Sequence, residues 1–211
     1  MQVLRWSEGQ AGCEFEASND GTYRYALATD DFIITLAMDA QELEKARTRV
    51  EPVLGLFLSV RFLKQNPHRL APDKIKLEFV KHFHEKETPL DSERIVADIE
   101  VNNKKAELGA AGDIRKHPEK KGEIEADLEA QQRQASQMIE WVQTKTLQSI
   151  SPQNHDVSGW LLFSTTTRWI GELHRQEEFR LRVPMGNVEV EFPFTLPPSQ
   201  DDIRLRTRTA E

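Results

Sequence analysis

The residues in this sequence that could most directly do chemistry are His82 and His84, two histidines separated by one phenylalanine. Apolar and polar residues alternate around them, which predicts a strand from about residue 74 to residue 86 with one solvated face. Alternate residues of a strand share a face, so both imidazoles are expected to point the same way. Two neighbouring imidazoles are a common start for a site that holds a divalent metal such as zinc.

A zinc site needs a third and usually a fourth ligand, and no residue next to the histidine pair supplies one. His155 and His174 are candidate third ligands, although nothing in the sequence sets their distance from the pair. Glu85 and Glu87 follow directly, but on an ideal strand they point to the opposite face. A solvated strand face is therefore the favoured interpretation, and no cofactor is expected; a divalent metal at the histidine pair is the alternative.

Arg168 and Trp169 are the candidate partner-binding residues. Arginine and tryptophan are enriched among residues that dominate binding energy, and an arginine beside a tryptophan can stack on its ring. The alternative is structural, because large aromatic side chains mostly serve packing. In that case Trp160 lies in the core and Trp169 covers the edge of a sandwich.

Three arginines near the C-terminus, Arg204, Arg206 and Arg208, recur at every second position. Such a strip could contact the phosphates of a nucleic acid. A terminal segment without fixed structure is the favoured alternative. The net charge of −7 also argues against nucleic acid as the main partner, and a protein partner is expected instead.

Composition narrows the class of protein further. Hydrophobic residues make up 38% of the 211 residues, enough to bury a real core. The single cysteine, Cys13, excludes an intrachain disulfide and is interpreted as a small core residue. The chain opens without a signal-peptide pattern, and its most apolar run, residues 53–63, is too short to cross a bilayer. We therefore expect an acidic cytoplasmic protein without membrane contact.

The elements that position these residues are mostly hairpins. Residues 3–37 predict a β-meander with a tight turn at residues 19–21. Asp39 is predicted to cap a helix, with Glu42 three residues on, while residues 53–63 fit either a helix or a strand. The clearest hairpin has a turn at residues 184–187 and then a strand with five apolar residues at period two: Val188, Val190, Phe192, Phe194 and Leu196.

The middle of the chain has a different character, because charge dominates and aromatic residues nearly vanish. Residues 92–108 predict a helix that ends at the glycines of residues 109–112, and His117-Pro118 is a second break. Residues 122–150 carry apolar residues at helical spacing and acidic residues in the first turns, which predicts a second helix.

These elements predict an α+β fold in one domain, residues 1–211. Hairpins from the N- and C-terminal parts form an antiparallel sheet or sandwich, and residues 89–150 form a charged helical insertion. Phosphate loops, dinucleotide fingerprints, nucleophile elbows and zinc-protease motifs are absent. This favours a non-enzymatic protein-binding or scaffold module that acts through a helix face or a sheet edge. The alternatives are a metal-dependent or small-ligand-binding enzyme centred on His82 and His84, and a nucleic-acid-associated component.

Overall fold

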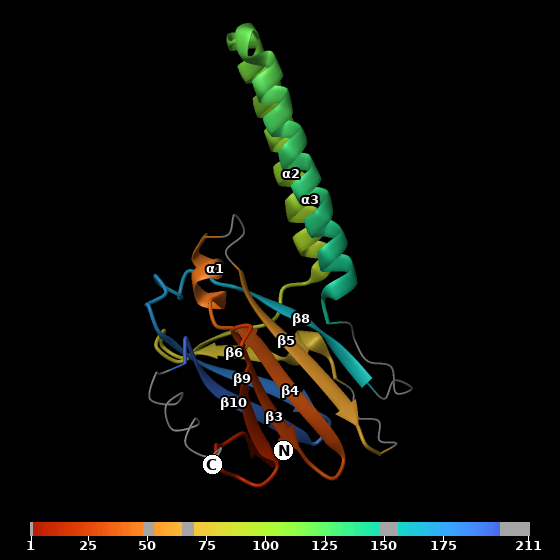
Figure 1. The fold of residues 1–211 in the computed structure, drawn as a ribbon, viewed down its shortest axis with the longest axis vertical. Helices are drawn as coiled ribbons and strands as arrows, with labels where there is room; N and C mark the ends of the chain where they lie inside the picture. Colours follow the sequence, from red (N-terminus) through yellow and green to blue (C-terminus); the bar gives the residue numbers. More distant parts are fainter. Residues whose placement is uncertain (1, 49–52, 65–69, 148–155, 199–211) are drawn as a thin grey trace. The chain divides into compact units, whose positions relative to one another are not determined.

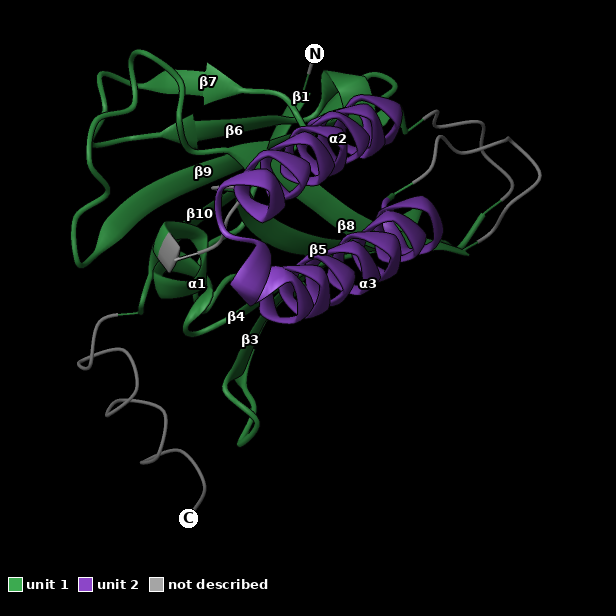
Figure 2. Cartoon of the chain, turned by 90° about the horizontal axis from the view of Figure 1, so that it is seen from above, with its two compact units in different colours: residues 1–89, 147–211 green, residues 90–146 purple. Residues whose placement is uncertain are grey.

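The computed structural model describes residues 2–48, 53–64, 70–147 and 156–198. The chain divides into two compact units, which Figure 2 colours separately. Residues 1–89 together with 147–211 form the sandwich unit, and residues 90–146 form the helical hairpin. The fold is α+β, as the sequence predicts, with the helical hairpin inserted between N- and C-terminal strands.

One sheet of the sandwich unit, the meander sheet, has the strand order β2-β3-β4-β5-β8 and is antiparallel throughout. The predicted turn at its start is present, because Gly21 has φ of 82° and the Thr22 N–H donates to Asp20 Oδ1 at 2.9 Å. Residues 53–62 could form either a helix or a strand by their sequence, and the structure shows a strand, which lies between β4 and β8. The strands are β2 (Cys13–Ala17), β3 (Thr22–Ala28), β4 (Phe32–Asp39), β5 (Val53–Phe62) and β8 (Asp156–Ser164).

The other sheet, the hairpin sheet, has the strand order β1-β10-β9-β6-β7. Its centre is the predicted C-terminal hairpin, whose turn has Gly186 at φ of 64°. The first strand of the chain runs parallel to the last one, so N- and C-terminal strands meet as expected. The strands are β1 (Gln2–Arg5), β6 (Lys76–Phe79), β7 (Glu85–Glu87), β9 (Glu177–Met185) and β10 (Val188–Leu196), with a 3-10 turn η1 (Pro72–Lys74) before β6.

The two sheets pack face to face, and the core lies between them (Figure 1). Period-two alternation sends one set of side chains of each strand inward. The rings of Tyr25 on β3 and Phe194 on β10 lie 6.3 Å apart and so connect the two layers. Phe79, Phe179 and Phe192 of the hairpin sheet are also buried. The outward set on the hairpin sheet is charged and forms ion pairs across its strands.

The helix predicted after Asp39 is short, α1 (Glu42–Thr48), and its start differs from the predicted capping box. Asp39 is the last residue of β4, and its Oδ1 accepts a hydrogen bond from the Gln41 N–H at 2.7 Å. Glu42 is buried, and its Oε1 accepts from the Gly55 N–H of β5 at 2.6 Å. This carboxylate therefore joins α1 to the meander sheet.

The helical hairpin consists of α2 (Ser92–Lys116) and α3 (Lys121–Lys145), joined by the 3-10 turn η2 (Pro118–Lys120). Asp91 caps α2 by accepting from the Glu93 N–H at 3.0 Å. The predicted break at residues 109–112 is wrong, since α2 runs through both glycines, while the break at His117-Pro118 is confirmed. A glycine costs roughly 1 kcal/mol within a helix, and pairing with the neighbouring helix offsets such a cost.

Deleting residues 90–146 and joining residues 89 and 147 by a short glycine-serine linker should leave the sandwich unit folded. The described members of the hydrophobic core cluster all lie outside residues 90–146. The two helices are antiparallel and equally long, so the ends to be joined lie at the same end of the hairpin (Figure 1). Circular dichroism should retain the strand signal, with one cooperative transition in denaturant. Non-cooperative unfolding of the shortened chain would contradict the expectation.

None of the helices among the described residues has both the length and the hydropathy that crossing a bilayer requires.

Candidate functional site

The connection between β6 and β7 holds both histidines of the predicted pair. The Glu85 N–H donates to the His82 carbonyl oxygen at 3.0 Å and so closes a tight turn. Phe83 and His84 lie within this turn at φ of 55° and 59°, in the left-handed region that the central residues of a type I′ turn adopt. The predicted single strand over residues 74–86 is therefore wrong, because its two halves are antiparallel strands of one hairpin.

The turn separates the two imidazoles, which corrects the expectation that they share a polar face. His82 is buried and its Nε2 lies 3.1 Å from Glu177 Oε1. His84 is exposed and its Nδ1 lies 2.7 Å from Glu78 Oε1. Phe83, which the alternation places in the core, is 95% exposed. The two histidines thus contact two different carboxylates, Glu177 and Glu78.

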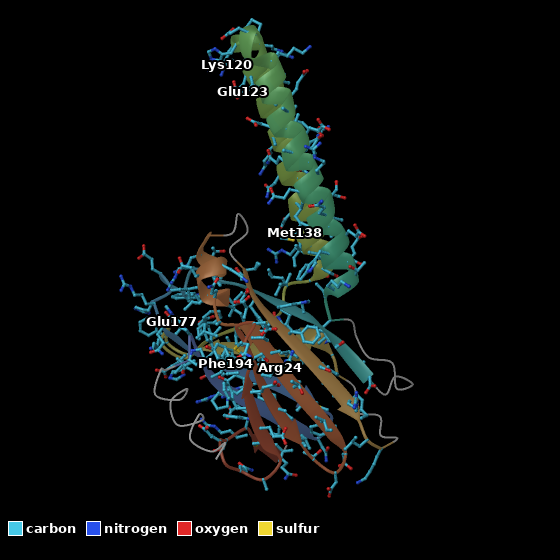
Figure 3. The ribbon with its side chains drawn as sticks, viewed as in Figure 1. Arg24, Lys120, Glu123, Met138, Glu177 and Phe194 are labelled. Carbon is cyan, nitrogen blue, oxygen red and sulfur yellow. The ribbon has the colours of Figure 1, made fainter. Side chains whose placement is uncertain are left out.

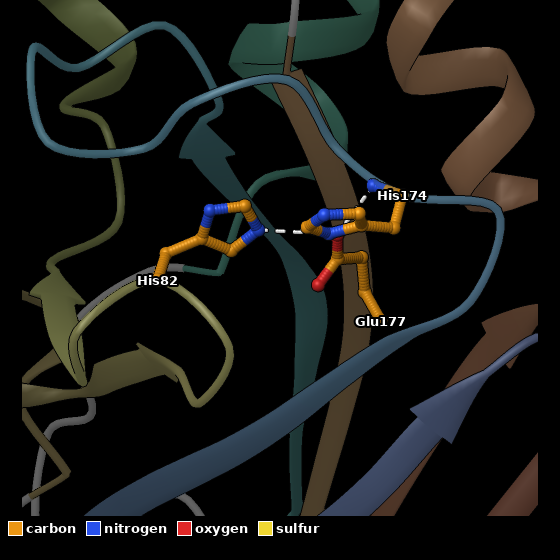
Figure 4. Close-up of side chains that lie close together, drawn as sticks. All are labelled: His82, His174 and Glu177. Carbon is orange, nitrogen blue, oxygen red and sulfur yellow. Dashed lines mark hydrogen bonds and ion pairs between the residues drawn. The ribbon is translucent and has the colours of Figure 1, made fainter.

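His82 meets a different histidine instead, and Figure 4 shows the arrangement. His174 lies in the loop before β9, and its Nδ1 is 2.7 Å from Glu177 Oε1. The His174 backbone N–H also donates to the same oxygen. The rings of His82 and His174 are 5.5 Å apart. Two imidazoles, from segments more than 90 residues apart in the sequence, therefore lie within hydrogen-bonding distance of the same carboxylate oxygen.

Glu177 is the first residue of β9 and is fully buried. Burial alone would raise the pKa of this carboxyl, but hydrogen bonds from the His174 N–H and from the two imidazoles outweigh it, so the pKa lies below its usual range. The carboxylate is thus ionised at neutral pH. Its second oxygen, Oε2, is buried and has no hydrogen-bond partner among the residues that the structure describes.

Among the described residues, His82, His174 and Glu177 form the one group of three or more His, Cys, Asp and Glu side chains close enough to hold a metal ion. His174 was a candidate third ligand from the sequence, whereas His155 lies outside the described residues. Glu85 and Glu87 are not members of the group. Glu177 was missed, although a signal existed: it has the same parity as Phe179, Leu181 and Val183, which marks a carboxylate on the inward face of the strand.

Arg168 and Trp169 lie together in the loop between β8 and β9. The Arg168 guanidinium carbon is 4.6 Å from the centre of the Trp169 ring, and Trp169 is 57% exposed. The next residue, Ile170, is buried and anchors the loop. Trp160 is half-buried, with its ring centre 5.6 Å from that of Phe57. The exposed stacked pair is compatible with partner binding, which remains a prediction.

The faces of the helical hairpin carry few exposed apolar side chains. Val101 and Leu108 are exposed and seven residues apart, so they share one face of α2, while Met138 is exposed on α3 (Figure 3). The connecting end carries charged residues such as Lys120 and Glu123. Scattered apolar side chains are normal on a solvated surface, so the helix faces alone favour no particular partner.

Within the described part of the chain, one edge of the hairpin sheet has no neighbouring strand for part of its length. β1 pairs with β10 only as far as Arg5 and Glu191, and the Trp6 N–H donates to the Glu191 carbonyl oxygen at 2.8 Å. In a parallel ladder the Trp6 carbonyl would next accept from the N–H of residue 193, but Pro193 has none. The ladder therefore stops, and β10 continues to Leu196 without a described strand on that side. Proline has no N–H to give to a neighbouring strand, and Pro193 accordingly lies in the part of β10 that β1 does not reach.

A cavity of about 260 Å³ lies at this open edge. Four buried aromatic residues line it, together with two prolines and charged residues of both signs. The Trp6 indole is held in place because its Nε1–H donates to the carbonyl oxygens of Glu14 and Ala26 at 3.2 and 3.1 Å. The aromatic and proline members are Trp6, Tyr25, Phe179, Phe194, Pro193 and Pro198.

Arg204, Arg206 and Arg208 lie outside the described residues, so their predicted contact with nucleic acid stays a prediction. No protein-family model matches this chain, and no match was found among curated proteins or solved structures.

Proposed function

We propose that this protein is a binding module that accepts an extended segment of a partner protein along the open edge of β10. The observation that carries the proposal is the cavity beside Pro193 and Thr195, at the point where β1 stops pairing. An extended peptide can continue a sheet at such an edge, taking affinity from main-chain hydrogen bonds and specificity from side-chain pockets.

The edge offers a small set of main-chain groups. Odd-numbered residues of β10 direct their N–H and C=O groups away from β9, since the Glu191 carbonyl oxygen binds the Trp6 N–H on that side. Beyond Glu191 this leaves the carbonyl oxygens of Pro193 and Thr195 and the N–H of Thr195. Three such groups match a peptide of about three residues, so main-chain pairing alone would give weak binding.

The cavity supplies the remaining affinity and the selectivity. Its floor consists of buried aromatic rings and prolines, which suit an apolar or aromatic side chain of the incoming peptide. The floor is preformed, because the Trp6 indole already has its hydrogen bonds. The lining also contains charged residues of both signs, Arg5 and Arg180 against Glu8 and Glu178, and these favour peptide residues of mixed charge on either side of the apolar one.

Replacing Thr195 by proline should lower the affinity for such a peptide at least about tenfold. The substitution removes the N–H of Thr195, the one N–H of this edge without a hydrogen-bond partner among the described residues, and a tenfold loss corresponds to about 1.4 kcal/mol. A displayed peptide library would be selected on the full chain, and the affinities of enriched peptides would then be measured by fluorescence anisotropy. Alternating sequences with an apolar residue in a fixed position should be enriched.

Thr195→Val is the matched control, because valine keeps the N–H and the preference for a strand. Both variants should have the same far-ultraviolet circular dichroism as the wild type, since residue 195 donates nothing to β9. Selected peptides that bind Thr195→Pro as tightly as Thr195→Val would overturn the proposal, and so would a library from which nothing is enriched.

A further inference from the structure

We propose that His82, His174 and Glu177 form a binding site for a transition-metal ion of the zinc class, with one coordination position left open to solvent. This inference is independent of the proposed peptide binding, because none of the three residues lines the cavity at β10.

The donor set decides the class of ion. Two imidazole nitrogens and one carboxylate oxygen suit zinc and its neighbours, whereas calcium and magnesium take oxygen ligands. Each nitrogen that faces the carboxylate can become a ligand if its proton is carried by the other ring nitrogen. The ring of His174 is 64% exposed, so solvent reaches its other nitrogen.

The spacing of the ligand atoms fits a single ion after small shifts that lengthen both nitrogen-to-oxygen distances. The three atoms lie within 4.8 Å of one another, and the two nitrogen-to-oxygen distances are 3.1 and 2.7 Å. Ligands at about 2.0–2.2 Å from a tetrahedral zinc ion are about 3.4 Å apart. The carboxylate needs no large movement, because zinc would replace two hydrogen bonds to Glu177 Oε1 by two bonds to itself.

A second observation points to a missing ligand of this carboxylate. Glu177 is fully buried, yet its Oε2 has no hydrogen-bond partner among the described residues (Figure 4). A buried carboxylate oxygen without a partner is rare, because desolvation goes uncompensated. A metal ion held by both oxygens of the Glu177 carboxylate would supply that compensation.

The segments that carry the ligands are held in place by contacts outside the site. The Arg47 guanidinium donates to the Leu173 carbonyl oxygen at 2.8 Å, and Lys81 Nζ donates to the Gln176 carbonyl oxygen at 3.1 Å. On the side of His82, the tight turn closed by the hydrogen bond from the Glu85 N–H holds the backbone. Three protein ligands with one side facing solvent is the arrangement of metal sites that exchange a bound water, as opposed to closed four-ligand structural sites.

The test uses the full chain, stripped of metal with a chelator and without an affinity tag. Zinc chloride is titrated by calorimetry, and cobalt(II) chloride is followed through its visible absorption, which reports tetrahedral or five-coordinate geometry. One equivalent of metal should bind, and zinc should raise the melting temperature of the wild type.

His174→Ala is the main variant, because the side chain is exposed and its loss should not disturb folding. It should weaken zinc binding at least about tenfold and abolish the zinc-dependent rise in melting temperature. Glu177→Gln should do the same, and His84→Ala, which removes an exposed histidine outside the cluster, should bind zinc like the wild type. Absence of stoichiometric binding to the wild type, or binding that His174→Ala leaves unchanged, would overturn the assignment.

Discussion

Replacing Phe192 by alanine is expected to lower the free energy of unfolding by about 3–5 kcal/mol, the usual cost of truncating a buried phenylalanine. Phe192 lies at the centre of β10, pairs with Leu181 of β9 and is completely buried between the two sheets. The lost transfer free energy and the cavity that remains both contribute. Urea denaturation followed by circular dichroism measures the change.

Thr195→Ala is the matched control for this prediction, because residue 195 belongs to the same strand but to its other face. The control should change the free energy of unfolding by less than about 1 kcal/mol. A urea midpoint of Phe192→Ala equal to that of the wild type would contradict the burial of this side chain.

The strands that bury one face were predictable because period-two alternation survives in the sequence. In β10 the five alternating apolar residues, Val188 to Leu196, face the core or its margin as expected. The turns before β3 and β10 were predictable for a second reason, because Gly21 and Gly186 supply the positive φ that those turns need.

The turn at His82 was not predictable by the same rules. Tight hairpin turns favour glycine or asparagine, whereas here Phe83 and His84 occupy the left-handed region. Because Ile75, Leu77, Phe79 and Phe83 continue one alternating pattern, the segment was interpreted as a single strand. The pattern holds up to Phe79 and then fails, and the same error placed His82 and His84 on one face.

The candidate site could be predicted only in part, because its members meet through long-range packing. The pair of His82 and His174 depends on how β6 and β9 align, which no local pattern specifies. Glu177, in contrast, can be recognised from the local sequence, because it is an acidic residue at a position of β9 that faces the core. A carboxylate in that position must be paired to be stable, so such residues indicate a buried polar cluster.

Glu78 is a buried carboxylate whose replacement should have a large effect on stability. It lies on the outer face of β6 with only 3% of its side chain exposed. Two arginines of β9 approach it, with Arg182 Nη2 at 3.0 Å from Oε2 and Arg180 Nη1 at 3.5 Å from Oε1. His84 Nδ1 completes the group at 2.7 Å.

The pKa of Glu78 follows from these contacts. Burial raises it, but the hydrogen bond with His84 and the charges of Arg180 and Arg182 lower it by more, so the folded protein holds the pKa of Glu78 below its ordinary value. A carboxyl with a lower pKa in the folded than in the unfolded state stabilises the fold at pH values above the unfolded pKa of about 4.3. This stabilisation is lost as the pH falls through the folded pKa.

Glu78→Gln should therefore lower the free energy of unfolding by about 1–3 kcal/mol at pH 7, because the neighbouring arginines lose their charged partner in a partly desolvated site. The loss should shrink as the pH falls below the unfolded pKa of about 4.3, because the unfolded state then takes up a proton more readily than the folded state does. Urea denaturation of both proteins at pH 7, 5 and 3 measures the difference.

Glu16→Gln is the control for this prediction. It removes a carboxylate that is 63% exposed and 3.4 Å from Arg24, and it should change stability by less than about 1 kcal/mol at any of these pH values. A difference between wild type and Glu78→Gln that is the same at pH 3 and pH 7 would show that the charge of Glu78 contributes nothing to the fold.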